Sequence, residues 1–369
     1  MPAPSSPTSP DPSQGPTGQA PSGLATSDLA ADGAESPDPQ GHRAYPGRTF
    51  RRRALTALSL ILTALVVWAL VAFVLGHLPE FKKIWRQPIP KAVLALLPLS
   101  WLAMVAVNSE LLRRPLAAYG LKIAFSEGLA LTMASTAINY LIPLKSGSGL
   151  RGLYLAAGRG MKVTDYLALL GSVTAMTLTT ASFFAFLGLA CLWAQGHRPD
   201  LILPLYFGGT AILGFCSVLF LGRMPFRLPA KLQAIARGWD LLRSNRGLLP
   251  RLCLLQAGYF FGWAFFNWLT LAAFGIYLNP FQIVFFCGGQ IHATIVNLTP
   301  AGLGVVEAFS VYAGQTLGFT PAEALSAQGL YRLTSVAMLA IFGAWGWFHL
   351  TRLLRGRQAD ASGQPSDLT

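Results

Sequence analysis

Long apolar runs recur along this chain and restrict the folds open to it. Each run has roughly 20 residues or more, the length that an α-helix needs to cross a hydrocarbon core of about 30 Å. Only helices and closed barrels satisfy their own backbone hydrogen bonds in such a core. The runs lie at 54–76, 92–112, 165–194, 201–221, 252–278 and 325–350. The sequence therefore predicts an all-α integral membrane protein, a polytopic helical bundle with about six full spans.

Charged residues are few, and most of them are basic. They make up 12% of the 369 residues, against about 25% in soluble proteins, and the formal net charge is +13. Nucleic acid is a poor explanation for this charge, because the basic residues flank apolar spans and do not line an aromatic-rich polar surface. Anionic lipid head groups and membrane insertion favour such flanks. We therefore expect membrane lipids as partners and no nucleic acid.

Lys and Arg mark the loops expected on the cytoplasmic side. Basic clusters precede the first span, follow the second, precede the run at 165, fill the loop after 221 and follow the last span. By contrast, residues 276–324 contain no Lys or Arg. The pattern predicts a multi-pass protein of the cytoplasmic membrane with both termini in the cytoplasm. One loop disagrees, because this scheme places it outside although it contains Lys82, Lys83, Arg86 and Lys91.

Two further apolar stretches are broken in the middle and do not fit simple crossings. Residues 123–160 begin and end beside inside-type basic residues, whereas residues 281–318 begin and end on the outside-type face. We interpret both as re-entrant helical hairpins that enter from opposite sides, with their breaks facing an internal cavity. The order span, span, hairpin, span then occurs in 54–194 and again in 201–350. This order predicts an inverted repeat with a translocation site near the midplane.

The ends of the chain differ from this apolar region. Residues 1–46 are rich in Pro, Ser, Gly, Ala and Asp, and they predict a disordered tail that is not a signal peptide. Residues 47–352 form the predicted transmembrane domain, and residues 353–369 a short polar tail. The cysteines lie inside apolar runs without ligand spacing, so we interpret them as small buried apolar residues and expect no disulfide, metal or cofactor. They are Cys191, Cys216, Cys253 and Cys287.

The first break is rich in small residues and carries two cations. Its candidate binding residues are Asn139, Pro143, Lys145, Gly147, Ser148 and Arg151. A helix that starts here leaves backbone N–H groups free at the positive end of its dipole, which suits a phosphate, and Lys145 and Arg151 add full charges. The alternative is a tight turn whose two cations reach the lipid head groups. The sequence leaves both interpretations open.

The second break combines a helix start with an isolated acid. Thr299 before Pro300 predicts a capped helix whose N-terminus points into the membrane. Glu307 follows in an apolar context, where a carboxylate needs a partner, and Arg332 in the last span is the nearest candidate. Such a pair has either a structural role or a role in binding or proton coupling. The candidate binding residues are Asn297, Pro300, Gly302, Gly304, Glu307 and Arg332.

Enzyme motifs are missing from the sequence. It contains no hydrolase nucleophile elbow, HExxH zinc site or Walker loop, so we expect no catalytic residues. His292 in the second hairpin is interpreted as a hydrogen-bonded packing residue. Thr320 and Glu323 have the spacing of a capping box, which predicts the start of the last helix.

At its two breaks the sequence resembles the lysylphosphatidylglycerol synthase transmembrane-region family, also described as flippase-like domain proteins. The matching residues at the second break and in the last helix are Pro300, Gly302, Gly304, Glu307 and Arg332. Those at the first break are Asn139, Pro143, Gly147 and Arg151. Ser148 stands where that family commonly has Glu, so the acid of that position is missing here. The resemblance covers about residues 50–352.

This resemblance implies lipid translocation between leaflets, or lipid binding. The family includes the membrane flippase domain of the multiple peptide resistance factor. The soluble synthase domain has no counterpart here, so we expect no lysine transfer from tRNA. Our first hypothesis is a flippase for an anionic or modified phospholipid or a polyprenyl-phosphate lipid. The alternatives are a membrane transferase acting on a lipid phosphate and a non-transporting partner of a cell-envelope enzyme. A second copy of the chain is a further partner to consider.

Overall fold

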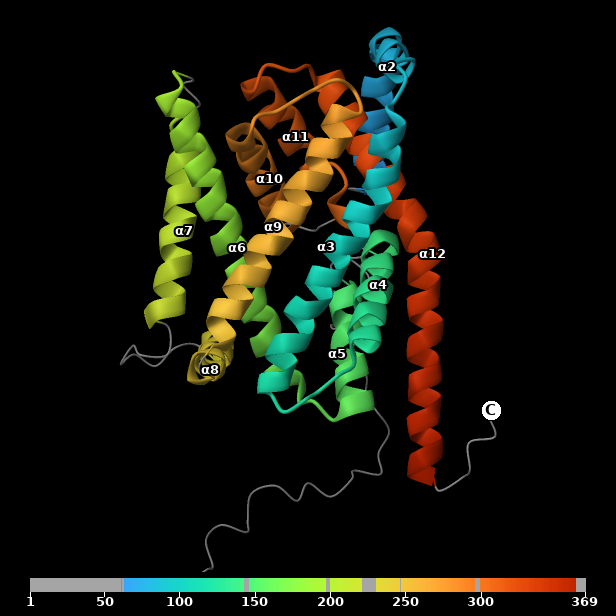
Figure 1. Ribbon diagram of the computed structural model, residues 1–369, viewed down its shortest axis with the longest axis vertical. Coiled ribbons are helices and arrows are strands. Elements are labelled where there is room, and N and C mark those ends of the chain that lie inside the picture. The colour runs from blue at the N-terminus through green and yellow to red at the C-terminus, as the bar shows by residue number, and fades with distance from the viewer. Residues whose placement is uncertain are drawn as a thin grey trace, which may run out of the picture. The chain divides into compact units, whose positions relative to one another are not determined.

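The computed structural model describes residue 61 and residues 63–142, 146–196, 200–220, 230–245, 247–295 and 299–362. Helices connected by short loops account for these residues, and no strand occurs among them (Figure 1). This agrees with the predicted all-α class. The tail predicted for residues 1–46 lies outside the described part of the chain.

Six apolar helices correspond to the predicted runs. Four of them are long and apolar enough to cross a membrane: α3 (Lys91–Ala118), α6 (Val163–Ala194), α9 (Leu248–Ala272) and α12 (Pro321–Ser362). The helix Thr63–Gly76 and α7 (Ile202–Phe220) are the other two. α12 exceeds its predicted range of 325–350 at both ends, so part of the predicted polar tail is helical.

Both predicted hairpins are present as pairs of shorter helices. The first consists of α4 (Phe125–Leu141) and α5 (Ser146–Arg159). The second consists of α10 (Pro280–Ile295) and α11 (Val305–Thr316), with the short 3-10 helix η1 (Pro300–Gly302) in its break. η1 contacts α4, so the break of the second hairpin adjoins the first arm of the first hairpin.

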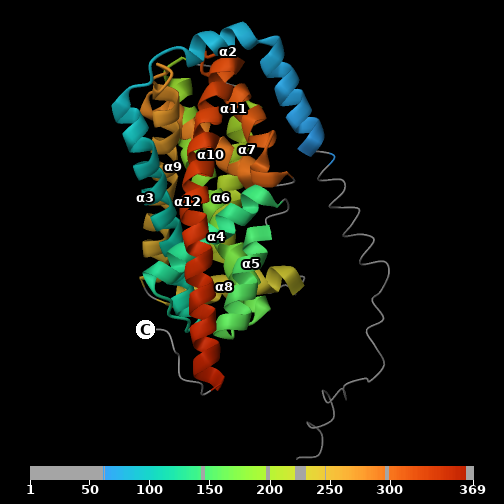
Figure 2. The same cartoon turned by 90° about the vertical axis from the view of Figure 1, so that its right-hand side faces the viewer.

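Two short helices, α2 (Leu78–Trp85) and α8 (Ala230–Ser244), fall outside the predicted spans. α2 is bent by 79° from the preceding helix and crosses one end of the bundle, whereas α5 and α8 lie at the other end (Figures 1 and 2). Phe81 of α2 is buried, and Lys82 and Lys83 are exposed. Three of the four cations of the disagreeing loop therefore lie on and beside a short helix with one buried face, outside the long apolar helices.

Glycines allow close helix contacts in the bundle. A Cβ on Gly346 of α12 would come within 2.7 Å of the Ala130 carbonyl oxygen in α4. A Cβ on Gly188 of α6 would come equally close, 2.7 Å, to the Phe281 carbonyl oxygen in α10. Small residues let helix backbones approach in a hydrocarbon environment, where packing drives association. Each hairpin therefore packs against the last long helix of the other half of the chain.

Large aromatic side chains fill the centre of the bundle, and apolar side chains also cover its outside. Phe266 and Phe286 are fully buried, whereas Leu213 is 72% exposed. Such exposed apolar residues suit contact with lipid chains. Of the four cysteines expected to be buried, Cys287 is buried and Cys191 is half-buried, whereas Cys216 and Cys253 are exposed; all four thiols are free.

Candidate functional site

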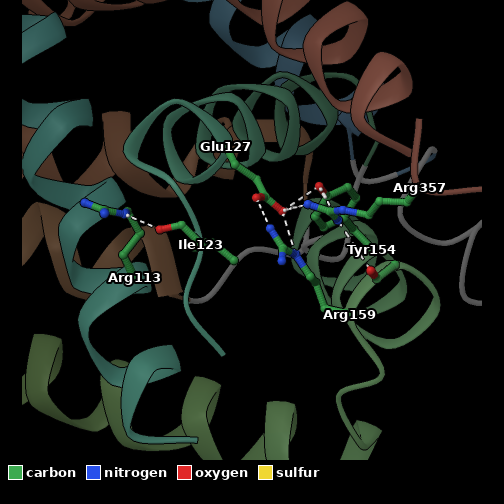
Figure 3. A network of polar contacts seen from close by, with 7 residues as sticks. Arg113, Ile123, Glu127, Tyr154, Arg159 and Arg357 are labelled. Carbon is green, nitrogen blue, oxygen red and sulfur yellow. Dashed lines mark hydrogen bonds and ion pairs between the residues drawn. The ribbon is translucent and has the colours of Figure 1, made fainter. Parts of the chain in front are cut away.

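A buried carboxylate lies where the first hairpin opens (Figure 3). Glu127, in the first turn of α4, is 2% exposed. Its Oε1 accepts hydrogen bonds from Tyr154 Oη at 2.7 Å and from Arg159 Nε at 3.1 Å, both in α5. Arg357 Nη2, from the end of α12, donates to the same oxygen at 3.1 Å, and Arg159 also pairs with Oε2. We call these four residues, which join three helices, the mouth cluster.

The mouth cluster keeps its acid charged. Burial raises the pKa of Glu127, but hydrogen bonds from Arg159, Tyr154 and Arg357 together lower it more, so the net pKa is below the ordinary 4.5. Two guanidinium groups therefore face one carboxylate at neutral pH. This cluster was not among the residues predicted from the sequence, although the sequence contains one signal for it. Glu127 and Arg159 each lie sixteen residues from Pro143, and an antiparallel hairpin brings such positions together.

Glu307 and Arg332 form an ion pair at the second break, as predicted from the sequence. Glu307 lies in the first turn of α11 and is 5% exposed. Arg332 Nε, from α12, donates to Glu307 Oε1, and the backbone N–H of Gly304 donates to Oε2 at 2.7 Å. Arg332 Nη1 also donates to the Ala301 carbonyl oxygen at 3.5 Å. Because charge and hydrogen bonds are both satisfied, the pair is tolerable in a membrane interior.

The helix of the second break begins later than the sequence predicts. Thr299 caps no helix, because its Oγ1 donates to the Leu303 carbonyl oxygen at 2.7 Å. η1 follows directly, and α11 begins only at Val305. Gly302 and Gly304 have φ angles of 65° and 88°, a region that glycine adopts without strain. The backbone turns at Gly302 and Gly304 therefore separate the predicted helix start at Thr299 and Pro300 from the observed start of α11.

Arg151 connects the two arms of the first hairpin. Its Nε, in α5, donates to Ser135 Oγ of α4 at 2.6 Å. The phenols of Tyr166 in α6 and Tyr259 in α9 lie close enough to interact with it electrostatically. Within the described part of the chain, no carboxylate oxygen lies within 4.0 Å of its guanidinium group. Arg159 of the mouth cluster is eight residues further along α5, so Arg151 lies about 12 Å deeper.

The other described residues of the first break hold its arms together. Gly147 donates its backbone N–H to Asn139 Oδ1 at 2.8 Å, and a Cβ on Gly147 would lie 1.8 Å from the Ser135 carbonyl oxygen. The Ser148 carbonyl oxygen accepts a hydrogen bond from Tyr166 Oη at 2.6 Å. Three predicted site residues lie outside the described residues: Pro143, Lys145 and Asn297.

His292 in α10 is hydrogen-bonded through both ring nitrogens, as expected for a packing residue. Ser182 Oγ lies 2.8 Å from Nε2, and Tyr206 Oη lies 2.8 Å from Nδ1. His292 also lines an open cavity of about 360 Å³ between α7 and the second hairpin, together with Phe207 and Phe309. Among the described residues, no cluster of His, Cys, Asp and Glu is suited to a metal ion.

Comparison with known proteins supports the expected resemblance. The family model described as "Lysylphosphatidylglycerol synthase TM region" matches residues 56–343, which include both hairpins and Arg332. The UPF0104 membrane protein MJ1078 of Methanocaldococcus jannaschii is 29% identical over 219 residues, covering 56% of this chain and 91% of that protein. With its apolar helices, the chain is a multi-pass membrane protein. It belongs to the family of the lysylphosphatidylglycerol synthase transmembrane region.

Proposed function

We propose that this protein moves a lipid between membrane leaflets without making or breaking covalent bonds. The lipid is an anionic or modified phospholipid or a polyprenyl-phosphate lipid, and its head group crosses between the two hairpins. The proposal includes about six full spans, two re-entrant hairpins, cytoplasmic termini and two halves related by an inverted repeat. Broken helices at matching places in two inverted halves line the substrate path in several transporter folds.

One contact that recurs in both halves carries the proposal. Gly188 lies 25 residues after the first residue of α6, and Gly346 lies 25 residues after the first residue of α12. Gly346 meets Ala130, five residues into α4, and Gly188 meets Phe281 and Phe285, one and five residues into α10. The last long helix of each half thus meets the first arm of the other half's hairpin through a glycine. This shared arrangement supports the proposed inverted repeat.

Charged side chains at different depths support a path for a head group. The mouth cluster lies at the end of α5, and Arg151 lies about 12 Å deeper along the same helix. Glu307 and Arg332 lie at the break of the second hairpin, whose η1 adjoins α4. Charges inside a membrane are costly, and they mark substrate and ion pathways.

Lipid scrambling in liposomes tests the proposed function. The full-length protein is reconstituted with fluorescent phospholipids, and the fraction reaching the outer leaflet is measured by chemical bleaching. We expect Arg332→Ala to abolish transport, because Glu307 then lacks its counter-charge at the break. Arg352→Ala, which removes an exposed arginine from the same helix, serves as the matched control and should transport normally. A wild-type protein that scrambles no lipid of either class would refute the proposal.

Cysteine labelling tests the proposed orientation. The native cysteines are first replaced by Ala, and a single cysteine is introduced by Arg86→Cys beyond α2 or by Arg355→Cys near the end of α12. Both positions are exposed and lie at opposite ends of the bundle. We expect an impermeant maleimide to label intact cells only at position 86, and to reach position 355 only after permeabilisation. Labelling of both positions from the same side would contradict this orientation.

A further inference from the structure

In each hairpin, a side-chain hydrogen bond connects the two helices at equivalent positions, but the residue types differ between the hairpins. Ser135 lies ten residues after the start of α4, and Arg151 lies five residues after the start of α5. In the second hairpin, Gln290 lies ten residues after the start of α10, and Ser310 lies five residues after the start of α11. Both pairs are hydrogen-bonded, at 2.6 Å in the first hairpin and 2.9 Å in the second. A neutral pair therefore suffices to close a hairpin of this kind.

The neutral bridge, formed by Gln290 and Ser310, is buried inside the protein, and both side chains are hydrogen-bonded. Gln290 is 1% exposed, and Ser310 is 0% exposed. Trp263 Nε1 donates to Gln290 Oε1 at 3.2 Å, and Ser310 Oγ donates to the Val306 carbonyl oxygen at 2.7 Å. This bridge leaves nothing for a ligand to bind.

The Arg151 bridge is open by comparison. Arg151 is only partly buried, and its hydrogen bond to Ser135 uses Nε. Among the described residues, Ser135 is the acceptor of this guanidinium group, and it uses neither Nη1 nor Nη2. In the described part of the chain, Arg151 has no carboxylate within 4.0 Å, and Glu127 is paired with Arg159 and Arg357. Arg151 lies about 12 Å along α5 from Arg159 of the mouth cluster, on the side of the hairpin break.

We propose that Arg151 binds the phosphate of the lipid that this protein moves, an assignment that rests on the function proposed above. A guanidinium group binds phosphate oxygens through two parallel hydrogen bonds, and Nη1 and Nη2 are the atoms that remain for this. The phosphate supplies a negative charge beside Arg151, where no described carboxylate lies within 4.0 Å. Arg151 then binds the phosphate at a position between the mouth cluster and the break of the second hairpin.

The bridge of the second hairpin provides the variant that tests this site. Ser135→Gln combined with Arg151→Ser gives the first hairpin the neutral pair that the second one already has, so the double variant should fold. Native mass spectrometry of the full-length protein measures binding of phosphatidylglycerol. We expect affinity to fall about ten-fold or more, the loss expected for a charge-assisted hydrogen bond. Diacylglycerol, which lacks the phosphate, should bind equally to both proteins.

A second variant keeps Arg151 but gives its guanidinium group a carboxylate partner, so that it no longer binds a phosphate. Ser135→Glu places a carboxylate beside Arg151, and we expect it to displace phosphatidylglycerol while maintaining the bridge. Inorganic phosphate is titrated in parallel. If it competes fully with the lipid at this site, the ligand is free phosphate and the lipid assignment is overturned. Wild-type affinity for phosphatidylglycerol in a folded form of either variant would also overturn the assignment.

The binding and transport measurements separate the two proposals. If both variants lose phosphatidylglycerol binding but the wild-type protein scrambles nothing, the phosphate site stands and the transport function falls. If the wild-type protein scrambles lipid and neither variant changes its binding, the transport function stands and the assignment of Arg151 falls.

Discussion

Two buried acids show how single residues are stabilised inside this bundle. Glu127 and Glu307 both lie in the first turn of a hairpin helix, where the positive end of the helix dipole favours a carboxylate. Each is also paired with an arginine of α12, Arg357 or Arg332. The two acids therefore connect the hairpins to the same helix.

The charge of Glu127 should make stability depend on pH. Its pKa in the folded protein lies below the ordinary 4.5, because the hydrogen bonds outweigh the effect of burial. The resulting stabilisation is fully present above the unfolded value and is lost as pH falls through the lowered folded value. Thermal unfolding in detergent, from neutral to acidic pH, should therefore show a loss that Glu127→Gln lacks. Identical pH profiles for both proteins would contradict this role.

Arg332 should matter for stability as well as for transport. Arg332→Ala leaves Glu307 buried without its partner, which costs about 3–5 kcal/mol. Arg332→Met combined with Glu307→Gln removes both charges and should recover most of that loss. The unfolding temperatures of the single and double variants give the comparison. If the double variant were as unstable as Arg332→Ala, the stranded carboxylate would not be the cause.

Among the helices, the apolar runs predicted where the long helices and the two pairs of shorter helices lie. α2 and α8 escaped prediction because they are short, amphipathic and too polar to form an apolar run. Their positions depend on the bundle beneath them, which buries Phe81 of α2 and Trp239 of α8. A sequence shows the two faces of such a helix but not the surface that one of them covers.

The candidate site could be predicted only where charges stood out from apolar surroundings. The pairing of Glu307 with Arg332 could be predicted because each needs a counter-charge in an apolar environment. Their helices, α11 and α12, also follow one another along the chain. The contact of Glu127 with Arg357 joins residues far apart in the chain and depends on how α4 packs against α12. The Thr299 start was wrong because glycines with positive φ delay the helix.

The matching glycine contacts should respond alike to substitution. Gly188→Ala and Gly346→Ala each place a Cβ 2.7 Å from a backbone carbonyl oxygen, and such overpacking costs about 1–3 kcal/mol. Gly209→Ala in α7 is the control, since nothing lies within 4 Å of its added Cβ. Unfolding temperatures in detergent should fall by similar amounts for the first two and stay unchanged for the third. An unchanged unfolding temperature for Gly346→Ala would contradict the equivalence of the two contacts.

For the molecule as a whole, α12 is a helix that forms an ion pair with each hairpin. Arg332 and Arg357 are 25 residues apart in it, which is about 37 Å along a helix. Substitutions so far apart normally act independently. We expect Glu127→Gln and Glu307→Gln to be non-additive in scrambling rate, because both release the same helix. A double variant whose rate equals the product of the single effects would contradict this coupling.

α12 is one continuous helix that is paired with Glu307 through Arg332 and with Glu127 through Arg357. An unbroken helix moves as a rigid rod, so a displacement at one of these ion pairs is transmitted to the other. Under the proposed function, we expect the two hairpins to respond together when a head group passes.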